Sequence, residues 1–394
     1  MPYGISAFQQ LMEPLDRRMM NRIVAGHGGD RGVGDGANAW GCVRHLRTLL
    51  FAQFGGLNSL REIEHGLAAQ PRSLYHLDLR LPRRSTLSDA MAKRPWPVFR
   101  DIAVALMGRA DRTLRRAGGE LIELIDGSPI HLDAQRFPWA EADPHTRGLK
   151  LHVGYDPRAD TATWMALETA RMSELKVARQ QPIRPGTVYV FDKGYCDFGW
   201  WHRIDEAKAT FVSRLKRNTH RRDVAPRIPR GEGIIADNEL RIGHARPRGG
   251  AVNPLFETPL RDILVERQGK EPLRLITNDL SRSAADIAAL YKERWQIELL
   301  FKWLKQNLKI RRFIGRSENA VKTQIFVALI AFLLLRLLRH SHARSREHSA
   351  KNLIARIKVS LMRPLDLTNR ATAPPRPPAY LPTSPQLALS LPLQ

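Results

Sequence analysis

The chain has 394 residues, enough for two or three domains with a sizeable hydrophobic core. Its formal net charge is +24, and a surplus of that size indicates a polyanionic partner, for which nucleic acid is the first candidate. Two cysteines exclude a disulfide-rich secreted protein, and the longest apolar run, Ile325 to Leu335, is shorter than the about 20 residues that span a bilayer, which indicates a core helix in a cytoplasmic protein without a membrane segment.

The first part of the chain, residues 1–115, has the apolar spacing of helices. A helix is predicted over residues 39–54, where apolar side chains recur at helical spacing and two glycines follow. The glycine-rich stretch before it, residues 26–36, lacks the GK[ST] ending of a phosphate-binding loop, so an ordinary loop is predicted there. These features predict a helical N-terminal domain.

Two short helices within this domain have the pattern of a helix-turn-helix unit. Asn58 or Ser59 is placed to cap the first helix, and Ser85 is placed to cap the second. In that motif the start of the second helix enters a DNA groove. Arg83 and Arg84, just before the second helix, are therefore predicted to contact DNA, although many all-helical domains contain such a pair without binding DNA.

From Glu120 onwards the pattern changes to strands that alternate with helices. Strands are predicted over residues 121–132, 150–157, 161–168, 187–195 and 210–218, and short helices over 173–180 and 200–207. Strands followed by alternating helix and strand predict a mixed α/β sheet. Residues 218–270, which are rich in Arg, Gly and Pro, are predicted to form a strand-and-loop insertion rather than a separate domain.

Two aspartates end apolar runs of strand type, Asp126 after LIELI and Asp192 after TVYVF. A carboxylate at the end of a buried strand is costly unless it is paired or binds a metal ion. Gly127 and Gly194 follow closely, however, and Asp-Gly is also a common way to begin a turn. Taken alone, Asp126 fits the turn better than the metal site.

A third carboxylate, Glu298, lies on a helix predicted from Ser283 to about Leu308. At about 100° per residue, a group of polar side chains falls within roughly 40° of Glu298. These side chains are Tyr291, Arg294, Lys302 and Lys305. The rest of the circumference is apolar, which predicts a mostly buried helix whose charged stripe faces a wet cleft. The alternative is an exposed ladder of ion pairs along the same stripe.

Two strand-end aspartates and a helix glutamate are a donor set that suits Mg²⁺, a hard cation with oxygen ligands. Two such ions about 4 Å apart activate an attacking oxygen and stabilise a leaving oxygen in phosphodiester chemistry. Arg294 would hold a phosphate through its guanidinium fork, and Lys302 and Lys305 would act as point charges. The residues therefore predict phosphodiester chemistry with two Mg²⁺ ions, for which Mn²⁺ would substitute.

The motifs around these carboxylates resemble those of bacterial insertion-sequence transposases with a DDE triad, the group named after insertion sequence four. The resemblance rests on IDGSPI around Asp126, on YVFDKGYCDF around Asp192, and on a Y-x2-R-x3-E-x6-K signature. That signature reads here as Tyr291, Arg294, Glu298 and Lys305. The N-terminal segment LFAQFGGLNSLREIEHGL also resembles the helical domain that often precedes this catalytic core.

The resemblance implies an α/β fold with an RNase H-like, retroviral integrase-like catalytic core over residues 116–345. A strand-rich insertion at about 218–270 would interrupt this core, a helical domain over 1–115 would precede it, and a basic, then Pro-rich, disordered tail would follow over 346–394. Catalysis and metal binding would fall to Asp126, Asp192 and Glu298, and DNA contacts to the polar side chains of the stripe.

The implied reaction is metal-dependent cleavage at transposon ends, followed by attack of the freed 3′-hydroxyl on target DNA. The implied partners are double-stranded DNA, in the form of terminal inverted repeats and target, and a second copy of the chain in a homodimer. The expected location is the nucleoid of a bacterial cytoplasm.

A hairpin intermediate on the transposon end is also implied, but one expected residue is missing. In hairpin-forming relatives a tryptophan in the insertion stacks on a flipped base, whereas here the chain has no tryptophan between Trp201 and Trp295. Either Phe256 substitutes for it, or the flipped base is held elsewhere in the protein. Two other functions remain open from the sequence: a DNA-binding repressor without catalysis, and a nuclease that cuts DNA but never joins it.

Overall fold

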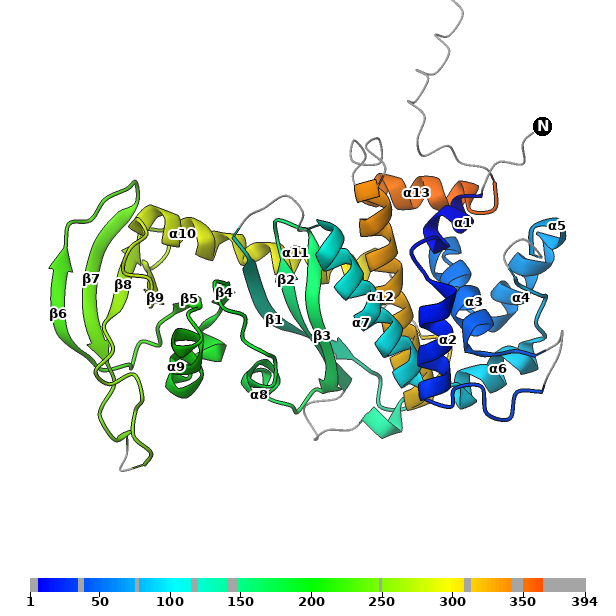
Figure 1. The fold of residues 1–394 in the computed structure, drawn as a ribbon, viewed down its shortest axis with the longest axis horizontal. Coiled ribbons are helices and arrows are strands. Elements are labelled where there is room, and N and C mark those ends of the chain that lie inside the picture. Colours follow the sequence, from blue (N-terminus) through cyan, green and yellow to red (C-terminus); the bar gives the residue numbers. More distant parts are fainter. Residues whose placement is uncertain are drawn as a thin grey trace, which may run out of the picture.

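The computed structural model describes residues 6–34, 39–74, 78–114, 120–140, 148–247, 250–307, 313–341 and 350–363. Within these residues, a group of helices at the N-terminal end and a long sheet lie on opposite sides of two long helices, α7 and α12 (Figure 1). The sheet and the helices on its two faces carry the predicted catalytic residues.

The part of the chain that precedes the sheet is helical, as predicted. Its helices are α1 (Ala7–Met12), α2 (Arg17–Gly26), α3 (Cys42–Gly55), α4 (Leu60–Ala68), α5 (Pro71–Leu74), α6 (Arg84–Lys93) and α7 (Trp96–Leu114). The helix α3 ends at Gly56, whose left-handed φ of 73° favours glycine. Residues 27–34 form turns and irregular chain, in agreement with the predicted loop, whereas residues 35–38 lie outside the described residues.

The helix pair of the predicted helix-turn-helix is present, but its second helix begins earlier than predicted. Ser59 caps α4 by accepting a hydrogen bond from the backbone of Glu62. The helix α6 begins at Arg84 with Arg83 as its N-cap and without a side-chain cap, so the prediction that Ser85 caps it was wrong. The side of α6 that faces the core is the one that carries the buried residues Leu87, Ala90 and Met91.

The sheet begins with the five strands of an RNase H-like core. These strands are β1 (Ile122–His131), β2 (Gly148–Asp156), β3 (Thr161–Thr169), β4 (Val188–Phe191) and β5 (Thr210–Arg214). They stand in the order β3-β2-β1-β4-β5, antiparallel across the first three and parallel from β1 to β4 to β5. The helices α8 (Glu174–Arg179) and α9 (Phe198–Glu206) follow β3 and β4, as their predicted positions require.

The insertion extends this sheet instead of forming a separate unit. Its strands are β6 (Arg221–Arg227), β7 (Ile234–Ile242), β8 (Leu260–Val265) and β9 (Leu273–Thr277). The strand β9 pairs antiparallel with β5, so the described residues form one sheet of nine strands that ends at β6. The sheet therefore reaches from the N-terminal helices to the far end of the molecule (Figure 1).

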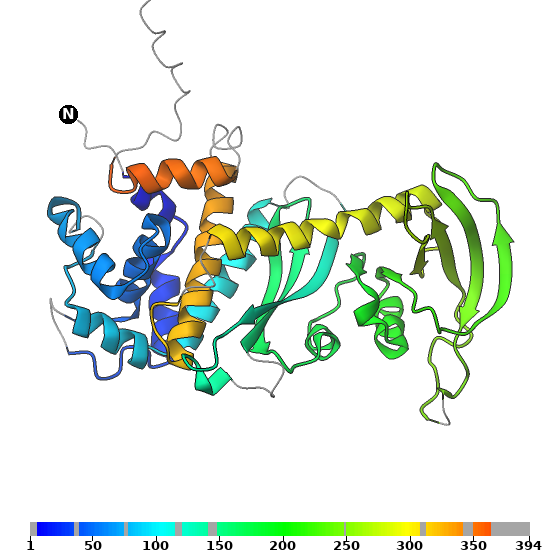
Figure 2. The ribbon, with the colours of Figure 1, turned by 180° about the vertical axis from the view of Figure 1, so that it is seen from behind.

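Two helices in line, α10 (Ala284–Glu293) and α11 (Trp295–Asn307), replace the single long helix that the sequence predicts. The pattern of backbone hydrogen bonds tightens at Arg294, whose N–H reaches the carbonyl of Tyr291 and whose carbonyl accepts from Ile297. Figure 2 shows the pair running along one face of the sheet, from the inserted strands to α12. The helix α10 contacts β4 and β5, and α11 contacts β1.

The helix α12 (Glu318–Ser341) is the central helix of the fold. It packs against α3, α6 and α7, and against the edge strand β3. Among the described residues, Glu318–His340 is the one helical stretch that is long and apolar enough to cross a membrane. Of its most apolar 18 residues, 83% are buried inside the protein. The predicted apolar run at 325–335 is thus the middle of a longer core helix.

A helix also forms in the segment that the sequence assigns to a disordered tail. This helix, α13 (Ala350–Ser360), packs against α3 and α1. Leu353 and Ile357 are fully buried there, which gives the segment the apolar contacts that a disordered tail lacks. The prediction of disorder was therefore wrong for residues 350–360, and the Pro-rich stretch from Pro374 onwards lies outside the described residues.

Candidate active site

The two aspartates lie side by side because of the register between β1 and β4. Ile125 pairs with Phe191 in the last parallel pair of these strands, and Asp126 and Asp192 are the residues that follow each partner. The strand β1 continues through Asp126 to His131, paired with β2, so the alternative of a turn at Asp126 was wrong. Only β4 ends at this point, and Asp192 starts a short 3-10 helix, η4 (Lys193–Tyr195).

The polar stripe of α10 and α11 faces these aspartates. The hydroxyl of Tyr291 donates a hydrogen bond of 3.2 Å to Oδ1 of Asp192. The guanidinium of Arg294 lies 2.6 Å from Oε1 of Glu298 and 3.8 Å from Oδ2 of Asp126. One cation thus bridges the carboxylates of β1 and α11, and the structure brings all three predicted carboxylates to one edge of β1 and β4.

A cleft of about 470 Å³ opens beside Asp126 and Glu298. Its wall consists of residues from β1 and α11, most of them polar, together with Phe301. These residues are Asp126, Gly127, Ser128, Glu298, Lys302, Lys305 and Gln306. The ammonium of Lys305 donates a 2.6 Å hydrogen bond to Ser128, while Lys302 is exposed. The predicted wet cleft is present, and two cations project into it.

The apolar part of α11 is less buried than its apolar spacing predicts. Ile297, Leu300 and Leu304 are buried, but 58% of Trp295 and 48% of Leu299 is exposed. The two exposed side chains are four residues apart and therefore share one side of the helix. They lie on one side of Glu298, so the candidate site has an apolar surface beside its charged one.

Burial raises the pKa of Asp126 to about 6. The backbone N–H of Gly127 and the guanidinium of Arg294 oppose this rise, while Glu174 and Glu298 add to it by repulsion. The pKa of Arg294 is raised even though burial alone would lower it, because Glu298, Tyr291 and Asp126 stabilise its charged form. Negative charge is thus concentrated at the edge of β1 beyond what a single arginine neutralises.

Because the folded-state pKa of Asp126 exceeds its ordinary value, ionisation of this carboxyl opposes folding in the absence of a metal ion. The penalty is absent below pH 4, grows as the pH rises through 6, and is constant above that. We expect Asp126→Asn to raise the free energy of unfolding by about 2–3 kcal/mol at pH 8 and to leave it unchanged at pH 3.5. Urea unfolding in EDTA at both pH values measures this difference, and an equal effect at both would contradict the assignment.

The residues at this edge fit a divalent cation. Three carboxylates and a polar cleft supply oxygen donors on one side and room for water and phosphate on the other. Among the described residues no three His, Cys, Asp or Glu side chains stand close enough to hold an ion as they are placed. Arg294 lies between Asp126 and Glu298, where its positive charge neutralises part of theirs.

Arg214, at the end of β5, is a residue of this site that the sequence pattern does not reveal. Its guanidinium lies 3.6 Å from Oδ1 of Asp192. The signal that would have found it is its position, because the carboxyl ends of the parallel strands β4 and β5 meet at the same edge of the sheet. With Arg294 and Lys305 it surrounds the carboxylates with cations suited to bind phosphate.

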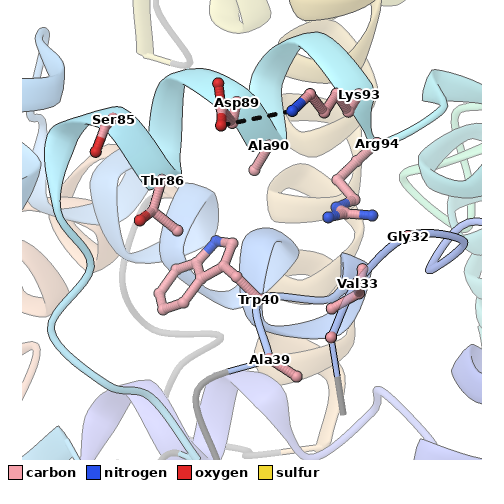
Figure 3. Close-up of a pocket in the computed structure, with 11 residues that line it drawn as sticks. Gly32, Val33, Ala39, Trp40, Ser85, Thr86, Asp89, Ala90, Lys93 and Arg94 are labelled. Atoms are coloured by element: carbon pink, nitrogen blue, oxygen red, sulfur yellow. Dashed lines mark ion pairs between the residues drawn. The ribbon is translucent and has the colours of Figure 1, made fainter.

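The predicted DNA contacts Arg83 and Arg84 do not join this site. They lie at the start of α6, on the far side of α7 and α12 from the sheet (Figures 1 and 2). Both are exposed, and Arg84 pairs with Glu64 of α4 at 3.3 Å. Figure 3 shows the underside of α6, where Trp40 and Arg94 line a cavity of about 370 Å³. Arg84 and Ser88 are exposed one helical turn apart, and together with Arg83 they form the outer face of α6.

Comparison with known protein families gives two matches. A family described as "Transposase DDE domain" matches residues 117–334, and a family described as a domain of unknown function matches residues 3–80. The first match covers the sheet, its insertion and the helices α10 and α11, and hence all three carboxylates.

Individual relatives agree with the family match. The chain is 42% identical to a putative transposase, y4zB, of Sinorhizobium fredii over 65% of this chain and 71% of the relative. It is 27% identical to a probable insertion-sequence transposase of Geobacillus stearothermophilus over 74% of this chain and 76% of the relative. It is also 27% identical to a putative insertion-sequence transposase of a Synechocystis species, over 64% and 71% of the two chains. A piggyBac transposase bound to hairpin DNA aligns with 90% of this chain and 79% of its own at 12% identity, with a TM-score of 0.49.

Proposed function

The chain belongs to the family of DDE transposases, DNA-cutting and DNA-joining enzymes that depend on divalent metal ions, and we propose that Asp126, Asp192 and Glu298 are its catalytic residues. The observation that carries the proposal is the register of β1 and β4, which sets the two aspartates side by side. Arg294 supports the proposal, because its guanidinium contacts both Asp126 and Glu298 and so connects the helix carboxylate with that of β1.

We propose Mg²⁺ as the physiological ion, bound as a pair, with Mn²⁺ as a substitute. Oxygen donors alone, with space for water, favour Mg²⁺ over Zn²⁺. When bound, the ions would activate the attacking oxygen and stabilise the leaving one. The three carboxylates would hold them, and Arg294 would swing from between Asp126 and Glu298 towards a DNA phosphate.

The other side chains of the stripe have distinct roles in this proposal. Tyr291 orients Asp192 through its hydroxyl, as its 3.2 Å hydrogen bond indicates. Lys302 and Lys305 project into the cleft and bind phosphates of the strand next to the cut. Arg214 balances the charge of Asp192 when neither metal nor DNA is bound.

The DNA partner would be held at two places. We propose that the sheet side binds the transposon end at its cleavage site and that the outer face of α6 reads DNA further inside the end. Two ends must be brought together for integration, so a homodimer on paired ends in the bacterial nucleoid fits the function. We propose to change one part of the predicted domain division, which is a helical domain over 1–115, a catalytic domain over 116–345 and a tail over 346–394. The helices α12 and α13 pack with the N-terminal helices and would belong with them.

The face of α6 offers a test of this second DNA-binding surface. We expect the double variant Arg83→Ala/Arg84→Ala to bind the transposon end more weakly. The slope of the logarithm of the binding constant against the logarithm of salt concentration should also become shallower, by about 1 for each phosphate that the protein no longer neutralises. The matched control is Arg72→Ala, an exposed arginine on the neighbouring helix α5. Fluorescence anisotropy at several salt concentrations measures both, and an unchanged slope in the double variant would refute DNA binding by this face.

A hairpin intermediate gains a candidate base-stacking residue from the structure. Phe256 is a poor one, because Arg222 already covers its ring at 3.5 Å. Trp295 is a better one, since 58% of it is exposed and it follows Arg294 directly. We therefore propose that Trp295 takes the stacking role that the insertion lacks.

Strand cleavage followed by strand transfer tests the proposed function. DNA that carries the inverted repeats flanking the gene should be cut in Mg²⁺ and left intact in EDTA, and the cut end should join to target DNA. A repressor would bind this DNA without cutting it in either buffer. A nuclease would cut it but give no joined product.

A further inference from the structure

A fourth carboxylate, Glu174 at the start of α8, lies directly behind the two aspartates. It approaches from the face of the sheet opposite α11, because its partner Lys150 and its neighbour Gly127 belong to that face of β2 and β1. A Cβ atom on Gly127 would lie 3.2 Å from Oε1 of Glu174, and one on Gly194 would lie 3.7 Å from Oε2. The glycines after Asp126 and Asp192 therefore leave a gap that this carboxylate fills.

The carboxylate of Glu174 is held by a single cation. The ammonium of Lys150 lies 3.2 Å from its Oε1, and the two side chains are 21% and 30% exposed. No second positive partner of Glu174 stands within 4 Å among the described residues. His152 of β2 pairs with Gly127 and lies on the same face of the sheet as Lys150. It is fully buried, and neither of its ring nitrogens has a hydrogen-bond partner among the described residues. The region behind the sheet thus has one counter-ion for Glu174 and unsatisfied polar atoms among the described residues.

The hydroxyl of Tyr195 is a second unsatisfied polar group in this region, independent of His152. Tyr195 is only 1% exposed, and its hydroxyl has no partner among the described residues. Burial raises its pKa, and the charges that add to the rise are Glu174, Asp126 and Asp192, in that order. A buried donor that faces three carboxylates and bonds to none is costly unless water or an ion completes its surroundings.

We propose that Glu174 is a fourth acidic residue of the catalytic centre, which strengthens the hold of Asp126 and Asp192 on a divalent cation through the gap at Gly127. The proposal rests on the proposed function of the triad. Repulsion by Glu174 adds to the rise in the pKa of Asp126. When no metal ion is bound, Lys150 neutralises Glu174. A bound cation then competes with Lys150 for the negative charge of Glu174.

The proposal predicts opposite effects for the two partners of this ion pair. Glu174→Gln should weaken Mn²⁺ binding by about 10-fold, the size expected when a supporting group of a metal site is lost. Lys150→Met keeps the aliphatic stem but removes the competing charge, so it should strengthen Mn²⁺ binding. In the double variant the affinity should equal that of Glu174→Gln, because Lys150 acts only through Glu174.

Mn²⁺ titration of the full-length protein without DNA, read by the electron paramagnetic resonance of free Mn²⁺, measures these affinities directly. The matched control is Glu206→Gln on the neighbouring helix α9, which removes one negative charge away from the site and should leave the affinity unchanged. Melting curves followed by circular dichroism show whether each variant is folded. If Glu174→Gln is unfolded, Lys150→Met alone still tests the proposal.

The outcomes separate this proposal from the proposed function. If Glu174→Gln and Lys150→Met both bind Mn²⁺ as the unaltered protein does, the pair is a structural brace and the proposal is overturned. Equal weakening by both variants would overturn it as well. Asp126→Asn is the reference: if it also leaves Mn²⁺ binding unchanged, the triad itself is wrong, whereas loss of binding in Asp126→Asn alone leaves the triad standing without Glu174.

Discussion

Replacing Glu298 with Gln is expected to lower the rate of strand cleavage by about 1,000-fold or more. The variant removes the negative charge of one carboxylate from the proposed metal site, where the bound ions stabilise the charge of the transition state by several kcal/mol. Each loss of about 1.4 kcal/mol lowers the rate tenfold. The amide keeps the size of the side chain, so the helix α11 should stay in place. Cleavage of end-containing DNA in Mg²⁺, measured at saturating protein, gives the rate.

DNA affinity is expected to stay within about threefold in this variant, because the phosphate contacts come from cations and not from Glu298. The matched control is Glu293→Gln, which removes the same charge at the end of α10. It should cut DNA at the normal rate. Normal cleavage by Glu298→Gln would remove Glu298 from the triad, and loss of DNA binding together with cleavage would show that the change acts on folding instead.

Much of this site could be predicted from the sequence, because its residues carry local signals. Asp126 and Asp192 each follow an apolar run that is typical of a buried strand, and the helical spacing of Tyr291, Arg294 and Glu298 puts them on one stripe. These signals depend only on neighbours in the chain. The β1–β4 register, which makes the two aspartates adjacent, depends on pairing between distant segments and had to come from the structure.

Other features escaped prediction for the same reason. Trp295 and Leu299 have the spacing of a buried helix face, but the sheet and α12 cover only the opposite side of α11, so both are exposed. Glu174 looks like an ordinary first-turn glutamate of a short helix, and only the packing of α8 behind Gly127 reveals its neighbours. Residues 350–360 look like part of a basic tail until α3 and α1 supply the apolar surface that α13 covers.

A buried ion pair in the insertion connects the extended sheet to the start of α10. Arg261 of β8 is 3% exposed and binds Asp237 of β7, 4% exposed, through two hydrogen bonds of 2.8 and 2.7 Å. The remaining nitrogen of Arg261 donates to the carbonyl of Arg282, which immediately precedes the N-cap of α10. Arg282 in turn pairs with Glu120, just before β1. This chain of contacts fixes the helix that leads to Glu298 relative to the strand that carries Asp126.

Replacing Arg261 with Met is expected to lower the free energy of unfolding by about 3–5 kcal/mol, because it leaves the carboxylate of Asp237 buried without a counter-ion. The methionine fills most of the space, so the missing charge and not a cavity dominates the loss. The double variant Arg261→Met/Asp237→Leu removes both charges and should recover most of the stability, since a buried pair replaced by apolar groups of similar volume is often neutral. Urea unfolding of the single and double variants measures the coupling between the two sites.

The same variants separate the stability of the fold from its influence on catalysis. In the double variant the carbonyl of Arg282 loses its donor even though the core of the insertion is satisfied, so α10 is less firmly held. We therefore expect slower cleavage together with weaker Mn²⁺ binding, because Glu298, one of the three proposed metal ligands, is no longer kept in position at the far end of the helix pair. If the two single-site losses simply add in the double variant, the pair does not act as one unit and the insertion is held by its apolar contacts instead.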